Sequence, residues 1–253
     1  MLELKNINIQ YGSKCAVKDV SIKLYSGDWL VLLGANGAGK SSIIKALARA
    51  VKYSGEILLE GKNISCFSSR QYAQRVGVLS QLHEKDPSLS VSEVVRLGRY
   101  SHGKRLFSGL NKIDIQKVEQ AIAVTGLIEY SERPMHTLSG GERQRAYLAQ
   151  VFAQDTDILL LDEPVNSLDM KYTLSLLKAI DVWRKERRGI VISALHDLSL
   201  AACFGSRALI LLNGEQLFEG NIKDALYSPH IDMAYDLPVA KTMQDVYSFW
   251  EKA

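Results

Sequence analysis

The pattern of apolar and polar positions divides the chain into strands and helices. Alternation over Leu2–Ile9 and Val17–Leu24, with turn residues between them, predicts two strands of an antiparallel edge. Later apolar runs lack alternation, which is typical of parallel strands buried on both faces: Trp29–Leu33, Ile158–Leu161, Ile190–Ala194 and Ala208–Leu212. Because helical patterns separate the later runs, we expect an α/β fold with a mostly parallel sheet and covering helices.

A helical stretch interrupts this succession of strands and helices. Ser90 and Glu93 have the spacing of a capping box at a helix start, and Asp114 is expected to open a second helix that stops at Gly126. Successive helices with no strand between them predict a helical subdomain inserted at about 82–154, within a single domain spanning 1–253. The C-terminal tail, about 229–253, has a mixed pattern that indicates no role.

The clearest candidate site follows the apolar run Trp29–Leu33. Three glycines within Gly34–Gly39 let the backbone curl so that its N–H groups point at an anion, and the helix that follows adds its positive N-terminal end. Lys40 is then placed over the outer phosphates of a nucleotide, and the Ser41 hydroxyl is placed to ligate a bridging Mg²⁺. The spacing predicts a nucleotide site in this segment, which we call the phosphate-binding loop (Gly34–Ser41).

Polar residues also follow the other apolar strands. Asp162 and Glu163 come directly after a buried strand, at the sheet edge where such folds bind ligands. There Asp162 can hold Mg²⁺ through water, and Glu163 can orient and deprotonate a water aimed at the terminal phosphate. His196 follows the next strand, where its imidazole can hydrogen-bond the same phosphate or water. Gln81, at another strand exit, either reaches a metal-bound water or caps a loop.

Two further features of the sequence each allow two interpretations. In LSGGERQ, Ser139 is a good N-cap, Gly140 and Gly141 leave backbone N–H groups unobstructed, and Glu142 supports the first helical turn. The stretch is a second anion-binding helix start or only a well-capped helix. Tyr11, at the mouth of a turn before the phosphate-binding loop, either stacks on a base or packs on the sheet.

Composition limits the partners. The net charge is +3, with acidic and basic residues nearly balanced, so we expect no nucleic acid as partner. The three cysteines lack metal-ligand or disulfide spacing, which favours reduced thiols in a cytosol. No stretch approaches the roughly 18 apolar residues of a spanning helix, so we do not expect the chain to cross a membrane by itself.

Together these motifs resemble those of an ABC-type ATPase. The family pattern is matched, in order, by GANGAGKS at 34–41, Gln81, LSGGERQ at 138–144, ILLLDEP at 158–164, SLD at 167–169 and His196. The resemblance spans nearly the whole chain. It implies a P-loop ATPase core with an antiparallel β edge and an inserted helical subdomain, and ATP and Mg²⁺ as cofactors.

The resemblance also implies roles for single residues. Glu163 would be the general base, His196 the switch histidine, and Gln81 the residue that senses metal and membrane partner. ATP would be bound by Tyr11, which stacks on adenine, and by Gly34, Ala35, Asn36, Gly37, Ala38, Gly39, Lys40, Ser41 and Ser42, with Mg²⁺ held by Ser41, Gln81 and Asp162. In a head-to-tail homodimer, Ser139, Gly140, Gly141 and Glu142 of one subunit would act on the ATP of the other, with Asp169 at the interface.

A finer likeness points to a subgroup. LGRYSH at 97–102, LSGGERQRAYLAQ at 138–150 and ALHDLSLAACF at 194–204 are similar to ATPases serving importers of ferric siderophores, haem or cobalamin. This implies a peripheral ATPase at the cytoplasmic face of the cell membrane. It would power a separate permease through the Gln81 region and the helical subdomain, with an external substrate-binding protein as an indirect partner. The alternative is a soluble ABC ATPase, such as one in iron–sulfur cluster assembly.

Overall fold

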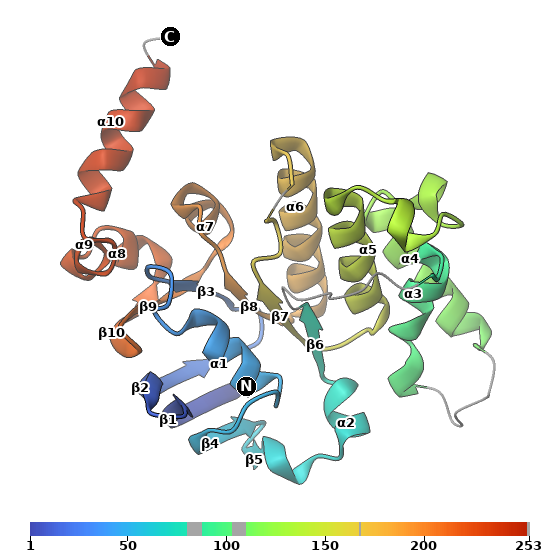
Figure 1. Cartoon of the computed structure of the whole chain (residues 1–253), viewed down its shortest axis with the longest axis horizontal. Coiled ribbons are helices and arrows are strands. Elements are labelled where there is room, and N and C mark those ends of the chain that lie inside the picture. Colours follow the sequence, from blue (N-terminus) through green and yellow to red (C-terminus); the bar gives the residue numbers. More distant parts are fainter. Residues whose placement is uncertain (80–87, 103–109, 167, 252–253) are drawn as a thin grey trace. The chain divides into compact units, whose positions relative to one another are not determined.

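The structure is a computed structural model that describes residues 1–79, 88–102, 110–166 and 168–251. Contacts within the chain divide it into two compact units (Figure 1). The first unit comprises Met1–Asn63 and Ile192–Ala253, and the second comprises Ile64–Val191. Gln81 lies outside the described residues, and each unit is described by itself below.

The first unit is built on strands in the order β5-β4-β1-β2-β10-β9-β3-β8. Their bounds are β1 (Leu2–Tyr11), β2 (Lys14–Leu24), β3 (Trp29–Leu33), β4 (Ser54–Leu59), β5 (Lys62–Asn63), β8 (Ile190–Ala194), of which the last three residues belong to this unit, β9 (Arg207–Leu212) and β10 (Glu215–Asn221). β1 pairs antiparallel with β2 and β4, whereas β3 pairs parallel with β9. The predicted antiparallel edge is therefore confirmed.

Local sequence explains how these strands are joined and buried. Asn213 and Gly214 have φ values of 51° and 84°, the positive φ angles that a tight hairpin turn between β9 and β10 requires. Every residue of β3 is buried. Trp29 lies in the core, where its indole N–H donates to the Ser193 hydroxyl at 2.9 Å, so its one polar group is satisfied.

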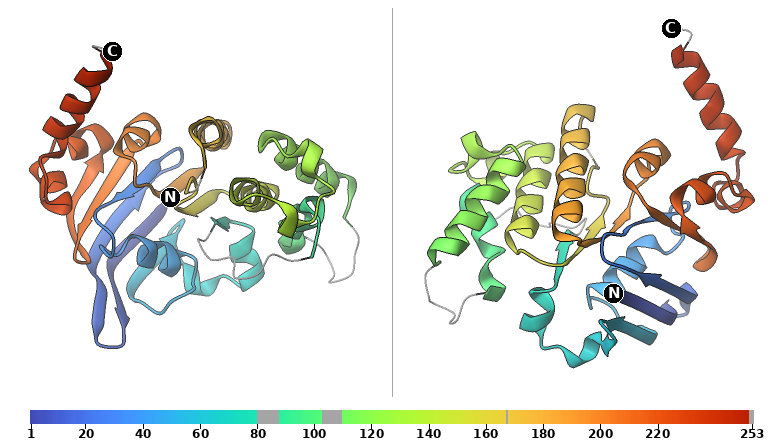
Figure 2. Two further views of the ribbon diagram at one scale, coloured as in Figure 1. Left: turned by 45° about the horizontal axis from the view of Figure 1, so that its top comes forward. Right: turned by 180° about the vertical axis from the view of Figure 1, so that it is seen from behind.

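Five helices complete the first unit: α1 (Lys40–Leu47), α7 (Leu198–Phe204), α8 (Ile222–Leu226), α9 (Pro229–Tyr235) and α10 (Val239–Glu251). The tail, which the sequence pattern left without a role, forms α9 and α10. Pro229 occupies the start of α9, where its missing N–H costs no helical hydrogen bond. α9 packs on β9, and α10 extends away from the strands of its unit (Figure 2).

The second unit combines a parallel strand pair with a group of helices. Its elements are β6 (Val76–Leu79), β7 (Ile158–Asp162), α2 (Ser69–Ala73), α3 (Val91–Leu97), α4 (Lys112–Val124), α5 (Gly140–Ala153) and α6 (Met170–Arg187), with short 3₁₀ turns at Ile64–Cys66, Tyr100–His102, Ile128–Tyr130 and Met135–Thr137. β6 and β7 run parallel, and α3 and α4 both pack on α5. The α/β fold class is confirmed, while the subdomain boundary at about 82–154 stays a prediction.

Capping boxes start α2, α3, α4 and α5, and the one at α2 joins Ser68 and Gln71. Ser90 and Glu93 form the predicted box at α3, and Ser139 and Glu142 form one at α5. At α4 the sequence prediction was off by one turn. Asn111 is the N-cap, and Asp114 is the third helical residue, whose carboxylate accepts the Asn111 N–H.

Candidate functional site

The phosphate-binding loop joins β3 to α1 in the first unit. Gly34 and Gly39 have φ values of 135° and 107°, and a Cβ atom would lie 2.3 Å from the Leu211 carbonyl oxygen at Gly34 and 2.6 Å from that of Ala16 at Gly39. Only glycine fits both the backbone angle and the space at these positions. The predicted curl of the loop is present, and the turn between β9 and β10 supports it, because the Gly214 N–H donates to the Ala38 carbonyl at 3.1 Å.

Lys40 lies inside this loop rather than in solvent. Its side chain is buried, and its ammonium donates to the carbonyl oxygens of Gly34 at 2.6 Å and Ala35 at 3.0 Å. A buried cation needs such acceptors to offset its lost hydration. Ser41 and Ser42 follow on the first turn of α1, and the loop tip from Ala35 to Gly37 is exposed. The loop therefore combines an exposed rim with a charge held at its base.

A tyrosine of the C-terminal segment also touches the loop. The Gly34 N–H donates to the Tyr235 hydroxyl at 3.1 Å, across 201 residues of sequence. Burial raises the pKa of Tyr235, and the hydrogen bond from Gly34 partly opposes that shift. The hydroxyl therefore stays neutral at ordinary pH. Sequence reasoning missed this residue, because nothing near position 235 resembles a nucleotide motif.

Tyr11 and His196 are the other sequence-predicted residues of the first unit. Tyr11 is the last residue of β1 and is 44% exposed. His196 is exposed just beyond the end of β8. The next residue, Asp197, caps α7 by accepting the backbone N–H groups of Ser199 and Leu200, and so fixes the turn that carries His196.

In the second unit the two predicted acids lie at the end of β7, which extends one residue further than expected and includes Asp162. Asp162 is the last residue of this fully buried strand, with only 4% of its surface exposed. Glu163 has a φ of 53°, a left-handed conformation that few glutamates adopt. Its carboxylate accepts the Asn166 side-chain N–H at 3.1 Å. This left-handed backbone conformation directly follows the last residue of β7.

The start of α5 is a well-formed N-terminus. The Glu142 carboxylate accepts the Ser139 backbone N–H at 2.8 Å and its hydroxyl at 2.9 Å, and the backbone hydrogen bond is the main reason why the pKa of Glu142 is lowered. Gly140 is exposed, with open space around its Cα. Gln144, one turn further, donates to the Pro164 carbonyl at 3.2 Å. This bond brings the LSGGERQ helix into contact with the turn after Glu163.

Asp169 and Arg145 are two further polar residues that hold helices of the second unit. Asp169 is the exposed N-cap of α6 and accepts the Tyr172 N–H at 2.9 Å. The sequence did not predict that Arg145 is buried. Its guanidinium donates to the carbonyls of Thr125 and Gly126 and stacks over the Tyr172 ring at 4.1 Å. It therefore ties α5 to the end of α4 and to α6.

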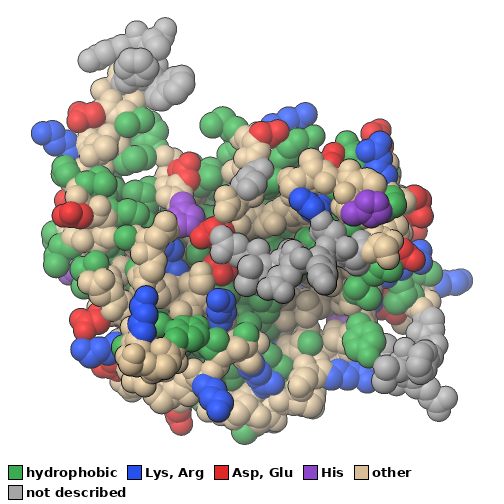
Figure 3. Space-filling model, viewed as in Figure 1, with side chains coloured by type: hydrophobic (Ala, Val, Ile, Leu, Met, Phe, Trp, Pro, Cys, Tyr) green, Lys and Arg blue, Asp and Glu red, His purple; other side chains and the backbone are tan. Residues whose placement is uncertain are grey.

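Charges of both signs are mixed on the face shown in Figure 3. Lysine and arginine side chains lie between aspartate and glutamate side chains, with hydrophobic and polar groups among them. The net charge of the chain is only +3. The described part of this face therefore presents no extended field of one sign, which is the feature that steers large polyanions.

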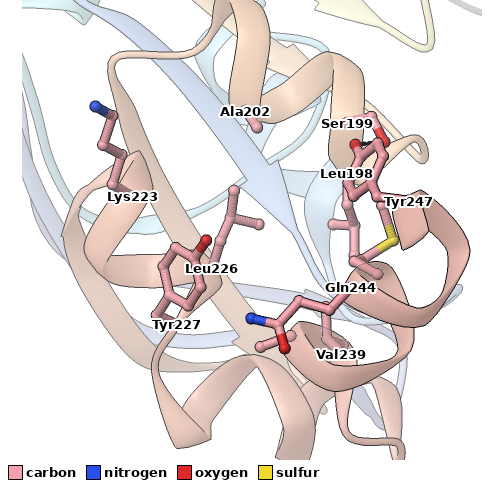
Figure 4. Close-up of a pocket in the computed structure, with 11 residues that line it drawn as sticks. Leu198, Ser199, Ala202, Lys223, Leu226, Tyr227, Val239, Gln244 and Tyr247 are labelled. Atoms are coloured by element: carbon pink, nitrogen blue, oxygen red, sulfur yellow. Dashed lines mark hydrogen bonds between the residues drawn. The ribbon is translucent and has the colours of Figure 1, made fainter. Parts of the chain in front are cut away.

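A groove of about 390 Å³ lies in the first unit between α7, α8 and α10. Figure 4 shows Leu226 and Val239 on its apolar side, and Tyr247 next to Ser199 at one end. The Tyr247 hydroxyl donates to the Ser199 hydroxyl oxygen at 2.7 Å. This contact holds α10 to α7, the helix that begins two residues after His196.

More than half of the chain matches a known protein family. The family model described as ABC transporter matches residues 17–166, a range that begins in β2 and ends just after β7. This chain belongs to the ABC transporter family. The matched range contains both the phosphate-binding loop and the LSGGERQ helix start.

Two relatives that are named as ATP-binding proteins of iron transport are similar to this chain over most of its length. This ABC protein is 36% identical to the iron(3+)-hydroxamate import ATP-binding protein FhuC of Bacillus subtilis over 226 residues, which cover 89% of this chain and 84% of FhuC. It is 32% identical to the ferric enterobactin transport ATP-binding protein FepC of Escherichia coli over 234 residues, which cover 92% of this chain and 86% of FepC.

Solved structures show the same fold. The ATP-binding cassette MJ0796, solved as a dimer in a post-hydrolysis state with ADP and Pi, has a TM-score of 0.77 at 23% identity, with 88% of this chain and 99% of that chain covered. The ADP conformation of MJ1267 has a TM-score of 0.79 at 20% identity, with 92% and 97% covered. The predicted P-loop ATPase core is confirmed by this fold. The family match and the ATP-binding relatives show that this ABC protein is an ATPase. Within the described residues, no helix is long and apolar enough to cross a membrane.

Proposed function

We propose that this chain is the ATP-hydrolysing subunit of an importer of ferric siderophores. The observation that carries the proposal is the likeness to FhuC and FepC, which extends over 89% and 92% of this chain. Haem and cobalamin are the other cargoes of the resembling subgroup. A role in iron–sulfur cluster assembly is not favoured, because these relatives are named for iron-complex transport.

The phosphate-binding loop is proposed to bind the phosphates of ATP. Its support is the backbone geometry at Gly34 and Gly39, where positive φ angles curl the loop as an anion-binding turn requires. The Lys40 ammonium is already desolvated at the base of the loop. When phosphates enter, their oxygens compete with the Gly34 and Ala35 carbonyls for that ammonium, and the exchange costs little further desolvation. The half-exposed ring of Tyr11 is proposed to stack on the adenine.

The donor set proposed for Mg²⁺ fits that ion. Ser41, Gln81 and Asp162 offer a hydroxyl, an amide oxygen and a carboxylate, all hard oxygen donors of the kind that Mg²⁺ takes together with water. Asp162 is almost fully buried, where a charged carboxylate is favoured by a nearby cation. When bound, Mg²⁺ neutralises charge on the phosphate oxygens.

Glu163 is proposed to act on the attacking water, and His196 on the terminal phosphate. The carboxylate of Glu163 would accept the proton of the water as its oxygen attacks the terminal phosphate. Asn166 supports this role, because its N–H contact fixes the carboxylate direction. His196, exposed at the end of β8, would hydrogen-bond the terminal phosphate. Gln81 is proposed to complete this group as a sensor of the metal and the membrane partner.

The functional form is proposed to be a head-to-tail homodimer. The exposed helix start at Ser139, with the open position at Gly140, can receive an anion presented by a second subunit. The exposed Asp169 would lie at the same interface. The Gln81 region and the helical subdomain would contact a permease at the cytoplasmic face of the membrane, and an external substrate-binding protein would deliver cargo to that permease.

The test measures uptake and hydrolysis with the same variants. In a strain lacking this gene, uptake of radiolabelled ferric hydroxamate, ferric catecholate and cobalamin is measured after complementation with wild type or Glu163→Gln. Wild type is expected to restore uptake of a ferric siderophore. Glu163→Gln is expected to restore none and to lower hydrolysis by about 10²-fold or more, with ATP binding retained, because the base is lost.

Glu60→Gln is the matched control. Glu60 is exposed, has the same φ of 53° as Glu163, and loses the same charge in this variant. It is expected to support wild-type uptake and hydrolysis. Unchanged siderophore uptake in the deletion strain would overturn the proposed cargo, and an unchanged hydrolysis rate in Glu163→Gln would remove Glu163 as the base.

A further inference from the structure

The C-terminal segment reaches the phosphate-binding loop at one atom. Tyr235 is the last residue of α9, and its hydroxyl accepts the Gly34 backbone N–H at 3.1 Å. Gly34 is the first residue of the loop, directly after β3. The contact lies within the first unit, so its geometry is that of one compact body.

Gly34 is held at its carbonyl, at its N–H and at its Cα. Its carbonyl accepts the Lys40 ammonium at 2.6 Å, and the Leu211 carbonyl of β9 fills the space where a Cβ would stand. The N–H group is therefore the remaining polar handle of a buried residue, and Tyr235 supplies its acceptor. A buried N–H without an acceptor would be costly, and the peptide could then rotate to seek another.

Docking of α9 holds the hydroxyl in place. Ile231 and Ala234, on this short helix, are almost fully buried, and α9 packs on β9, the strand that also supplies Leu211. The Asp232 carboxylate accepts the Val239 N–H at 2.7 Å and so links α9 to the first residue of α10. β9 therefore supplies the carbonyl that lies beside Gly34, and α9, which packs on β9, supplies the hydroxyl that accepts its N–H.

We propose that Tyr235 is a positioning residue for ATP binding. Its hydroxyl holds the N–H of the Leu33–Gly34 peptide and so restrains the backbone at Gly34, whose carbonyl, in the next peptide, sets the resting place of the Lys40 ammonium. The inference rests on the proposed role of the phosphate-binding loop in holding ATP. Tyr235 touches no phosphate in this scheme. It preorganises the loop, so its loss weakens ATP binding in the ground state and the transition state alike.

Tyr235→Phe is the test variant, because it keeps the ring and removes only the acceptor. ATP affinity is measured by calorimetric titration, and KM and kcat by steady-state hydrolysis. The expected result is an increase of about tenfold in Kd and KM, the scale of one lost buried hydrogen bond, with kcat within about twofold of wild type. A merely structural role would lower thermal stability and leave KM of the folded protein unchanged.

A spectroscopic readout follows the bond directly. With ¹⁵N-glycine labelling, the protein contributes 18 glycine amide signals, and the Gly34 signal is expected to move in Tyr235→Phe because its N–H loses an acceptor. The same spectrum reports the folded population, so the readout holds even if the variant is less stable. An unmoved Gly34 signal, or a wild-type KM, overturns the inference.

Two controls separate this inference from the proposed function. Tyr227→Phe removes a hydroxyl from the same segment, and Tyr227 is 74% exposed beside the groove of Figure 4, so ATP affinity is expected to stay at the wild-type value. Lys40→Ala tests the loop itself. If Lys40→Ala binds ATP normally, the proposed phosphate site fails. If Lys40→Ala loses ATP and Tyr235→Phe does not, only the role of Tyr235 fails.

Discussion

At the scale of the residue, Gly34 is the most constrained position of the candidate site. Its φ of 135° excludes most L side chains, and a Cβ would lie 2.3 Å from the Leu211 carbonyl oxygen. The two restrictions are independent, because one arises from the backbone angle and the other from a neighbouring strand. Gly61 is a natural comparison, since it has a φ of 78° but nothing within 4 Å of its Cβ position.

Gly34→Ala is therefore expected to destabilise more than Gly61→Ala. We expect Gly61→Ala to lower the free energy of unfolding by about 1–2 kcal/mol, the cost of a left-handed alanine. Gly34→Ala adds overpacking to a similar strain, for a total of about 3 kcal/mol or more. Urea denaturation of both variants measures the difference. Equal losses would show that β9 yields and that the steric part of the account is wrong.

At the scale of the element, a buried ion pair joins three helices of the second unit. Arg99, just after α3, donates to the Asp114 carboxylate of α4 at 2.8 Å and to the carbonyl of Ala153, the last residue of α5, at 2.9 Å. Both charged residues are only 5% exposed. In such a setting the pair matters most through what happens when one partner is removed, because the other charge is left buried and uncompensated.

Asp114→Ala is expected to lower the free energy of unfolding by about 3–5 kcal/mol. The combined variant Arg99→Met with Asp114→Ala is expected to lose less than Asp114→Ala alone, because no unpaired charge remains in the interior. Denaturant titration of the two single variants and the double variant gives the coupling. A double variant whose loss equals the sum of the single losses would contradict the pair.

At the scale of the whole molecule, the proposed dimer places the parts of one ATP site on two chains. The phosphate-binding loop with Lys40 and the helix start at Ser139 belong to different compact units of the chain, and the proposal pairs each with its counterpart in a second copy. If each site is shared, two variants that are inactive alone form an intact site when they are mixed in one dimer.

Mixing Lys40→Ala with Ser139→Arg subunits is therefore expected to restore activity that neither variant has alone. In a random equimolar mixture, half of the dimers contain both variants, and each of these has one intact site, so we expect about a quarter of wild-type hydrolysis. The measurement is steady-state ATPase activity after subunit exchange. A mixture that stays inactive, or full activity in either variant alone, would refute the shared site.

Most of the features that depend on neighbouring residues were predicted from the sequence. The curl of the glycine-rich turn after β3 and the helix caps at Ser90 and Ser139 were predicted, and each is present. The start of α4 was placed a turn late because Asp114 suits a first helical turn as well as a cap. Gln81 falls outside the described residues, so its role stays a prediction.

By itself, the sequence determined those features that a few neighbouring residues specify through backbone freedom, helix capping and apolar pattern. Only the tertiary structure decided that the Tyr235 hydroxyl meets the Gly34 N–H across 201 residues, and that Arg99 and Asp114 pair in the interior. The physical reason is that these contacts depend on how α9 docks on β9 and how α3 packs on α4. Such docking is a sum over many distant side chains, which no local period in the sequence records.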